Sequence, residues 1–534
     1  MTRALSLFAL LAAALTLLLA PSAFAAKGFQ YGVAAGDVTA RSAILWGKAN
    51  RSGEYGLEVA EDRRFRRAVL ARLVRARAAN DNTVQAKIKK LDPGTRYFYR
   101  FVGTRGRRSD VGVFRTAPGP RQNATIEFAW TGDTDFLPQM GEERPFWNDG
   151  QVFRRIRAER NHFNVHLGDT IYSDSEVDAP EGSPFPVALT VPQKWGKYKV
   201  NLANRHLRAV RGSAGFYSHW DDHEFINDFS PREDTFENLI SGISETVSGT
   251  VLYRRGVKAF TDYAPVTYSR AQGIYRSARW WRNLEVFFLD ERSFRDAKAD
   301  AGGVCDNPRT GSPDVAPTAP QSTRSVFGTV IPASGLLEPV SQACLDTIRD
   351  PNRDYLGDAQ FRRFTRAIRR SKARFKVIMN EMPIQQYYVL PYDRWEGYEA
   401  ERLRMLEFLS ENVKNVIFLT TDVHATLVND ARFQTIEPGG PRDSGIIDFT
   451  VGPAATANFE LEIDDVTGEG SATLVKAGFL EPAPPGGLGM RCSVLDQFSY
   501  GQVKVTRSRL TVTAKGTDGR PLDGCPPLVL RFES

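Results

Sequence analysis

Acidic residues and histidines recur where apolar runs end, and they are the residues of this sequence best suited to chemistry. They lie in the segments TGDTD, LGDTIYSD, WDDHEFIND and TTDVHAT. A hydrolytic site built on two metal ions needs a carboxylate that bridges the ions, more ligands on either side, and a donor that faces the leaving group. Taken together and in this order, the segments predict such a site. The candidate residues are Asp133, Asp135, Asp169, Tyr172, Asp221, Asp222, His223, Asn227, Asp422 and His424.

Individual roles follow from the residue types. Asp169 fits the bridging carboxylate, and His223, flanked by carboxylates, fits a general acid or a donor to a phosphoryl oxygen. Asp135 either caps its own turn or touches metal or substrate, and Asp221 either ligates or orients a neighbour. Arg292 in LDERSFRD follows another apolar run and either holds substrate or closes an ion pair.

The elements that must position these residues are apolar runs of strand length: IEFAWTGD, FNVHLGD, LEVFFLD, FKVIMNE and NVIFLTTD. Each ends in an acidic residue, and near-continuous apolar strands indicate a sheet covered on both faces. Helical stretches lie between several of them, such as 399–413, where Leu403, Leu406 and Leu409 share one face. Ligands in open α/β sheets bind beyond the carboxyl ends of the strands. The pattern predicts an α/β domain over 124–534, with a β-hairpin near its C-terminus.

Residues 28–117 follow a different pattern. Aromatic and β-branched residues alternate with polar ones, and turn residues recur about every ten positions. Tyr97, Tyr99 and Phe101 in one such run share a face. This pattern predicts a small immunoglobulin- or fibronectin-like β-sandwich, joined to the α/β domain by a linker that starts at Ala117.

Composition sets wider limits. The 534 residues are 42% hydrophobic and 25% charged, which excludes a disordered or fibrous chain. The net charge of +7 mildly favours anionic partners without demanding nucleic-acid-specific binding. Four cysteines allow three pairings, of which Cys305–Cys344 with Cys492–Cys525 closes two local loops and is the one expected.

The first 25 residues predict a secretory signal peptide. A charged start at Arg3 precedes an apolar run from Leu5 to Ala20, and a small-x-small cleavage motif ends at Ala25. The alternative is a membrane anchor, but a run of about 16 residues is shorter than the ~20 that span a bilayer. We therefore expect a secreted or periplasmic protein with a cleaved leader and no transmembrane segment.

The motifs, in their order, resemble the PhoD-type alkaline phosphatase and phosphodiesterase family. The matching segments are GVAAGDVTARSAILW, LGDTIYSD, WDDHEFIND, LDERSFRD, PYDRWEGYEAER and VIFLTTDVHA, and they cover nearly the whole chain after the leader. The resemblance implies a calcineurin-like metallophosphatase αββα sandwich behind an immunoglobulin-like domain. It also implies a mixed iron–calcium site that hydrolyses phosphate esters.

One departure bears on the metal. Better-known members of that family carry a Cys ligand where this sequence has Asp133. The four matching positions, which are Asp133, Asp169, Tyr172 and His424, are similar to the ferric site of purple acid phosphatases. The phenolate of a tyrosine favours a trivalent ion, so Fe³⁺ is expected there. The second position would draw on the oxygen donors Asp169, Asp222, Asn227 and Asp422. Such hard ligands suit Ca²⁺, or Mg²⁺ or Mn²⁺, better than Zn²⁺.

The expected activity is in-line attack on phosphorus by a hydroxide that the metals generate, with His223 as the donor. An alkaline phosphatase D-type monoesterase is the first reading. A phosphodiesterase of phospholipase D type is the alternative, since the motifs bind phosphorus and metal in both. A secreted binding module without catalysis is the distant third.

Overall fold

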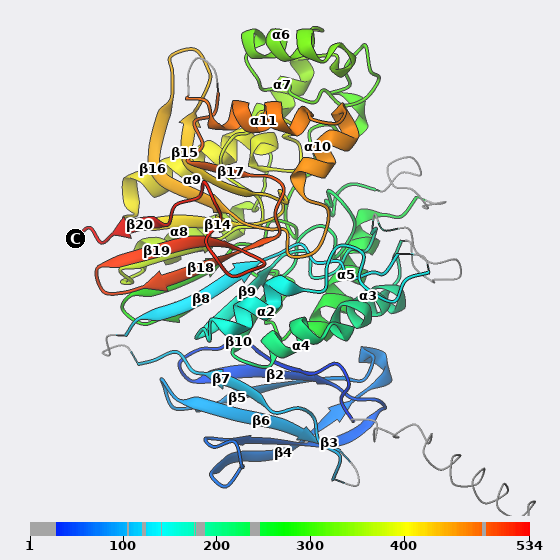
Figure 1. Ribbon diagram of the computed structural model, residues 1–534, viewed down its shortest axis with the longest axis vertical. Helices are drawn as coiled ribbons and strands as arrows, with labels where there is room; N and C mark the ends of the chain where they lie inside the picture. Colours follow the sequence, from blue (N-terminus) through cyan, green and yellow to red (C-terminus); the bar gives the residue numbers. More distant parts are fainter. Residues whose placement is uncertain are drawn as a thin grey trace, which may run out of the picture.

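The computed structural model describes residues 28–103, 106–119, 124–139, 141–175, 177, 187–234, 246–482 and 487–534. The predicted leader at 1–25 lies outside the described residues. Two large sheets form the centre of the molecule, and a smaller sheet lies at one end (Figure 1).

The first large sheet has nine strands. Their order is β20 (Leu528–Arg531), β19 (Arg509–Gly516), β18 (Ser499–Val505), β8 (Ile126–Thr131), β9 (Phe163–Leu167), β10 (Gly215–His219), β1 (Val33–Gly36), β2 (Ser42–Lys48) and β5 (Thr83–Lys89). The second has seven, in the order β11 (Arg276–Trp280), β12 (Leu284–Phe288), β13 (Phe375–Met379), β14 (Val416–Thr420), β16 (Arg442–Thr450), β15 (Thr426–Gln434) and β17 (Cys492–Val494).

Alternating side chains fix how the two sheets face each other. In β8, Phe128 and Trp130 enter the core between the sheets, whereas Ala129 joins the cluster beneath the helices. Val377 in β13 and Ile417 in β14 meet the same inter-sheet core from the other side. Successive residues of a strand point to opposite faces, so strands that are apolar on both faces must be covered twice.

Helices supply that cover. On the nine-stranded sheet lie α2 (Gln151–Ala158), α3 (Val191–Ala203), α4 (Arg205–Arg211) and α5 (Gly249–Tyr263), and on the seven-stranded sheet lie α8 (Asp358–Arg370) and α9 (Glu399–Asn412). This is the predicted αββα sandwich. Further helices gather at the end of the molecule opposite the sandwich domain (Figure 1). They are α6 (Gln321–Val330), α7 (Gln342–Arg349), α10 (Phe459–Thr467) and α11 (Ser471–Leu480). Short 3₁₀ helices are η1 (Ala78–Asn80), η3 (Ala301–Gly303), η4 (Pro332–Ser334) and η5 (Trp395–Tyr398).

The N-terminal β-sandwich shares a sheet with the α/β core. Its outer layer is a four-stranded sheet in the order β4 (Ala68–Ala76), β3 (Gly53–Ala60), β6 (Arg96–Val102) and β7 (Gly112–Arg115). Its inner layer is β1, β2 and β5, and β1 pairs in parallel with β10. Tyr97, Tyr99 and Phe101 are all buried, as their shared face predicts. The continuous sheet holds the sandwich in place against the core.

Two further expectations are confirmed. The disulfides are Cys305–Cys344 and Cys492–Cys525, and the C-terminal hairpin is β18–β19, which pairs with β8. Among the described residues, no helix combines the length and the apolarity needed to cross a bilayer.

Candidate metal centre

The four motif segments meet because three of the strands before them run side by side, and the fourth faces them from the second sheet, where the indole N–H of Trp130 in β8 donates to the carbonyl of Thr420 in β14 at 3.0 Å. Strands β8, β9 and β10 are parallel neighbours in the first sheet, and β14 belongs to the second. Asp133 follows β8, Asp169 follows β9, Asp222 follows β10 and Asp422 follows β14. The carboxyl ends of parallel strands share an edge, so the acidic residues collect there.

The backbone turns sharply at these positions. Asp133, Asp169, Asp422 and His424 have φ angles of +59°, +46°, +68° and +53°. Residues other than glycine rarely adopt this left-handed conformation, and such strain concentrates at functional sites. Close packing beside the turns requires Gly168, where an added Cβ would lie 2.8 Å from the Cβ of Asp221.

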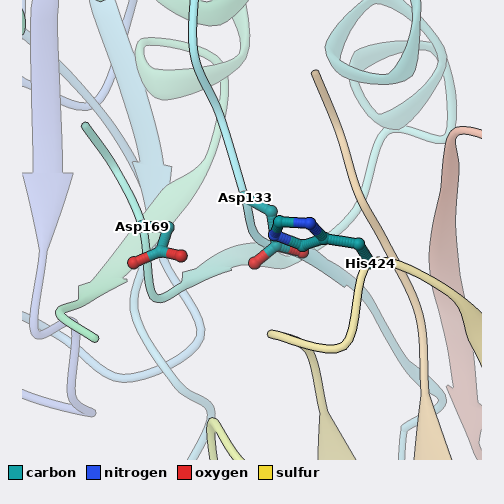
Figure 2. Close-up of side chains that lie close together, drawn as sticks. All are labelled: Asp133, Asp169 and His424. Carbon is teal, nitrogen blue, oxygen red and sulfur yellow. The ribbon is translucent and has the colours of Figure 1, made fainter. Parts of the chain in front are cut away.

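Asp133, Asp169, Tyr172 and His424 form the first ligand group. Carboxylate oxygens of Asp133 and Asp169 and a ring nitrogen of His424 lie within 4.8 Å of one another, and Figure 2 shows these side chains close together. The hydroxyl of Tyr172 is 2.8 Å from Nε2 of His424. A carboxylate pair, a phenol and an imidazole nitrogen therefore meet at one point.

The electrostatics of this group fit a cation. Burial, followed by repulsion from Asp221, raises the pKa of Asp133 to about 7, although His424 opposes the shift. Its Oδ2 is buried and has no hydrogen-bond partner among the described residues. Gly452, with φ at +132°, leaves room for that oxygen, because a Cβ there would approach it to 2.4 Å. A metal ion would compensate both the crowded charge and the unpaired oxygen.

A second ligand group adjoins the first. Asp169, Asp222 and His223 offer ligand atoms within 4.8 Å of one another, and so do Asp221, Asp222 and Asp422. Burial, then the charges of Asp221 and Asp222, raises the pKa of Asp422 well above its usual value. Asp169 belongs to both groups, which is the placement a bridging ligand requires.

Asn227 lies at the outer side of this group. Its side chain is exposed, and its backbone N–H donates to Oδ2 of Asp174 at 2.8 Å. The structure thus places Asn227 next to the second ligand group, with a side chain that is open to solvent.

His223 faces the same space and is held by a carboxylate that the sequence interpretation did not single out. Its Nδ1 lies 2.6 Å from Oδ1 of Asp174, and its ring packs at a tilt of 32° against Tyr172, with centroids 4.0 Å apart. Although burial opposes the shift, the charge of His223 lowers the pKa of Asp174 below its usual value. Asp174 was present in the motif LGDTIYSD, and only its distance from the strand end concealed it.

His424 has a comparable partner on a distant helix. Nδ1 of His424 contacts Oε1 of Glu462 in α10, which leaves Nε2 as the nitrogen aimed at the ligand group. Burial alone would lower the pKa of His424, but Glu462 and Asp133 raise it to about 9. Nothing in the sequence around Glu462 marks it as part of the site.

The two predicted substrate-binding residues have their polar atoms engaged by the protein. Oδ1 of Asp135 accepts the backbone N–H of Leu137 at 2.9 Å, and its other oxygen contacts Ser175. Arg292 is fully buried and donates from Nε to Oδ1 of Asp221 at 2.6 Å. It also pairs with Asp393 at 2.8 Å, so the ion-pair alternative for Arg292 is the one that the contacts favour.

Known proteins resemble the chain over most of its length. The family described as PhoD-like phosphatase matches residues 144–513, and the PhoD-like phosphatase N-terminal domain matches 13–118. Alkaline phosphatase D of Bacillus subtilis (strain 168) is 24% identical over 435 residues, which are 76% of this chain and 65% of that protein. The chain thus spans 65% of the length of this curated relative.

Solved structures share the fold. A structure of PhoD superposes with a TM-score of 0.69 at 19% identity, covering 96% of this chain and 92% of that one. A purple acid phosphatase, PPD1 from yellow lupin (Lupinus luteus) seeds, gives 0.54 at 12% identity, covering 95% and 74%. These likenesses confirm the metallophosphatase fold that the family resemblance implies.

Proposed function

The chain belongs to the PhoD-like phosphatase family, and we propose that it is a metal-dependent phosphoric ester hydrolase. The observation that carries the proposal is the meeting of Asp133, Asp169, Tyr172 and His424 at the strand ends, next to Asp222 and Asp422. Metal binding is supported by the crowded carboxylates, which need a compensating cation.

We propose that Asp133, Asp169, Tyr172 and His424 hold Fe³⁺, and that Asp169, Asp222, Asn227 and Asp422 hold Ca²⁺, with Mn²⁺ or Mg²⁺ as substitutes. The phenol of Tyr172 supports a trivalent ion, and the oxygen-only second group supports a hard divalent ion over Zn²⁺. When bound, the ions would supply Lewis acidity that polarises the ester phosphate and acidifies water.

His223 is the proposed proton donor to the leaving group. Asp174 holds Nδ1, fixes the ring orientation and stabilises the imidazolium, so that the opposite nitrogen, Nε2, would deliver the proton. Packing against Tyr172 keeps the ring beside the ligand group. A leaving alkoxide protonated in this way departs without a high-energy anion.

Arg292 and Asp135 are proposed to act by positioning. Arg292 holds Asp221, whose carboxylate neighbours Asp222 and Asp422, and thereby orients the second ligand group. Asp135 fixes the turn after Asp133 through Leu137. Neither role needs contact with substrate.

A monoester substrate is the first proposal, because the curated relative is an alkaline phosphatase. A phosphodiester is the alternative, since the same ligand groups would bind either. We also propose export, to the periplasm or the exterior, on the strength of the leader pattern and the two disulfides, which form in oxidising compartments.

Initial rates on p-nitrophenyl phosphate and on bis-p-nitrophenyl phosphate, measured side by side with calcium present, test the substrate class. A preference for the monoester supports the phosphatase, and a preference for the diester supports the phosphodiesterase. Metal binding without turnover of either would favour a binding module and refute the hydrolase.

A further inference from the structure

A cleft of about 610 Å³ lies between the sandwich domain and the α/β core. One wall is formed by β6 and β7, and the other by the end of α2 and the residues just before β9 and β10; Figure 1 shows β7 beneath α2 and β10. The cleft lies at the amino ends of β9 and β10, whereas the metal centre lies beyond their carboxyl ends. The length of β9 separates the two, roughly 17 Å.

Four of the twelve described residues that line this cleft are arginines. Arg96 and Arg115 come from the sandwich wall, Arg157 and Arg160 from the core wall, and all four side chains are exposed. Among the residues that the structure describes, no Asp or Glu lines the cleft. In the described part of the chain, none of the four arginines forms an ion pair; Arg115 donates only to the carbonyl of Gly94, at 3.0 Å.

Nearby carboxylates are already neutralised. Glu127 pairs with Lys504 at 3.0 Å, and Glu159, the neighbour of Arg160 in sequence, pairs with Lys515 at 2.7 Å. These two glutamates are therefore engaged by lysines outside the lining of the cleft, and neither pairs with its arginines. Unbalanced charge in a concave surface concentrates the field and attracts anions.

The cleft is also preformed. The backbone N–H of Val113 in the sandwich wall donates to the carbonyl of Gly212 at 2.9 Å, which ties the two walls together. Asn161 and Asn164 in the lining are buried, and Nδ2 of Asn161 donates to Oδ1 of Asn164 at 2.8 Å. A ligand that entered would meet fixed walls, so little ordering would oppose binding.

We propose that this cleft binds a multivalent phosphate anion, a short chain of linked phosphate groups, at a site separate from the metal centre. Guanidinium groups match phosphate oxygens in geometry and charge. Arginines on both walls favour a ligand with several phosphate groups over a single one, and the volume falls within the range of small-molecule sites. The proposal is independent of the hydrolase activity, because no residue of the cleft belongs to the metal centre.

Calorimetric titration with tripolyphosphate tests the site on the full protein, with metal ions in fixed excess so that chelation is the same in every titration. The variant Arg115→Gln/Arg157→Gln removes one guanidinium from each wall. The control Arg64→Gln/Arg66→Gln removes the same charge from exposed positions of the sandwich domain outside the cleft. Any binding at the metal centre is common to all three proteins.

The wild type and the control should each bind one equivalent of tripolyphosphate in the cleft. The cleft variant should bind none there, or bind it on the order of tenfold more weakly. Hydrolysis of p-nitrophenyl phosphate should be equal in all three. Identical titrations for the three proteins would overturn the site. A parallel titration of the wild type with citrate, an anion without phosphate, would also overturn it if citrate bound as tightly as tripolyphosphate, because the cleft would then show no preference for phosphate.

Discussion

Glu462 gives the sharpest test of how the first ligand group is held. Its carboxylate contacts Nδ1 of His424, which directs Nε2 at Tyr172 and the two aspartates. Partners of this kind fix the orientation of a ligating imidazole and raise its basicity, and their loss typically weakens metal binding about 10- to 100-fold. The side chain of Glu462 is 35% exposed, so solvent screens part of its charge and the lower end of that range applies.

A graded pair of variants separates charge from hydrogen bonding. Glu462→Gln keeps an oxygen that can accept from Nδ1 and should weaken retention of the first metal about threefold. Glu462→Ala loses both contributions and should weaken it about tenfold, or ~1.4 kcal/mol. The control is Glu460→Gln, on an exposed position of the same helix.

Metal retention is measured by elemental analysis after equilibration with graded chelator concentrations, with circular dichroism to confirm folding. The expected order is wild type and Glu460→Gln, then Glu462→Gln, then Glu462→Ala. If folded Glu462→Ala retained metal as well as the wild type, the role of Glu462 in holding His424 would be refuted.

Three other predictions concern stability. Replacing buried Arg292 with Met leaves the buried carboxylate of Asp221 without its arginine and leaves Asp393 paired with Arg295 alone, so the free energy of unfolding should fall by about 3–5 kcal/mol. Burial opposes the shift, but Arg292 and Arg295 hold the pKa of Asp393 well below its usual value, so the stability they supply is present above about pH 4 and lost as pH falls below it. Burial raises the pKa of Glu401 to about 7, so denaturant titrations should show stability falling by up to about 3 kcal/mol as pH rises from about 4.5 to 7, and Glu401→Gln should flatten this slope. Removing Cys305–Cys344, which spans 39 residues, should destabilise its loop by about 4 kcal/mol and speed proteolysis there.

Each of these has a clear contrary result. An unchanged unfolding midpoint for Arg292→Met would mean that the buried carboxylate of Asp221 does not need the charge of Arg292. If the free energy of unfolding depended on pH in the same way in the wild type and in Glu401→Gln, a group other than Glu401 would be responsible for the pH dependence. Equal proteolysis rates for the oxidised and the cysteine-free protein would show that the disulfide does not constrain the loop.

The sequence was sufficient to predict the core of this fold. Strands that are apolar on both faces predict sheets that are covered on both sides. Because each of these strands ends in an acidic residue, and parallel strands share an edge, the sequence also predicts the edge at which the ligands collect. The meeting of Asp133, Asp169 and His424 follows from this rule together with the motif order.

What the sequence did not reveal are contacts between distant segments. Glu462 lies 38 residues after His424 on a short helix whose pattern carries no sign of the site. The parallel pairing of β1 with β10 joins the sandwich to the core, and local alternation says nothing about which edge a strand extends. Arg292 was singled out by its place after a strand, but only the structure shows that Asp221 and Asp393 surround its side chain.

We propose above all that the two ligand groups that share Asp169 carry out metal-dependent hydrolysis of phosphate esters. To test this, the wild type and Asp169→Asn are each stripped of metal and then reconstituted with iron and calcium. The rate of p-nitrophenyl phosphate hydrolysis is measured before and after reconstitution. We expect that the stripped protein is inactive, that reconstitution restores the activity of the wild type, and that Asp169→Asn stays inactive while its circular dichroism remains native. Turnover by the stripped protein, or by Asp169→Asn at the rate of the wild type, would contradict it.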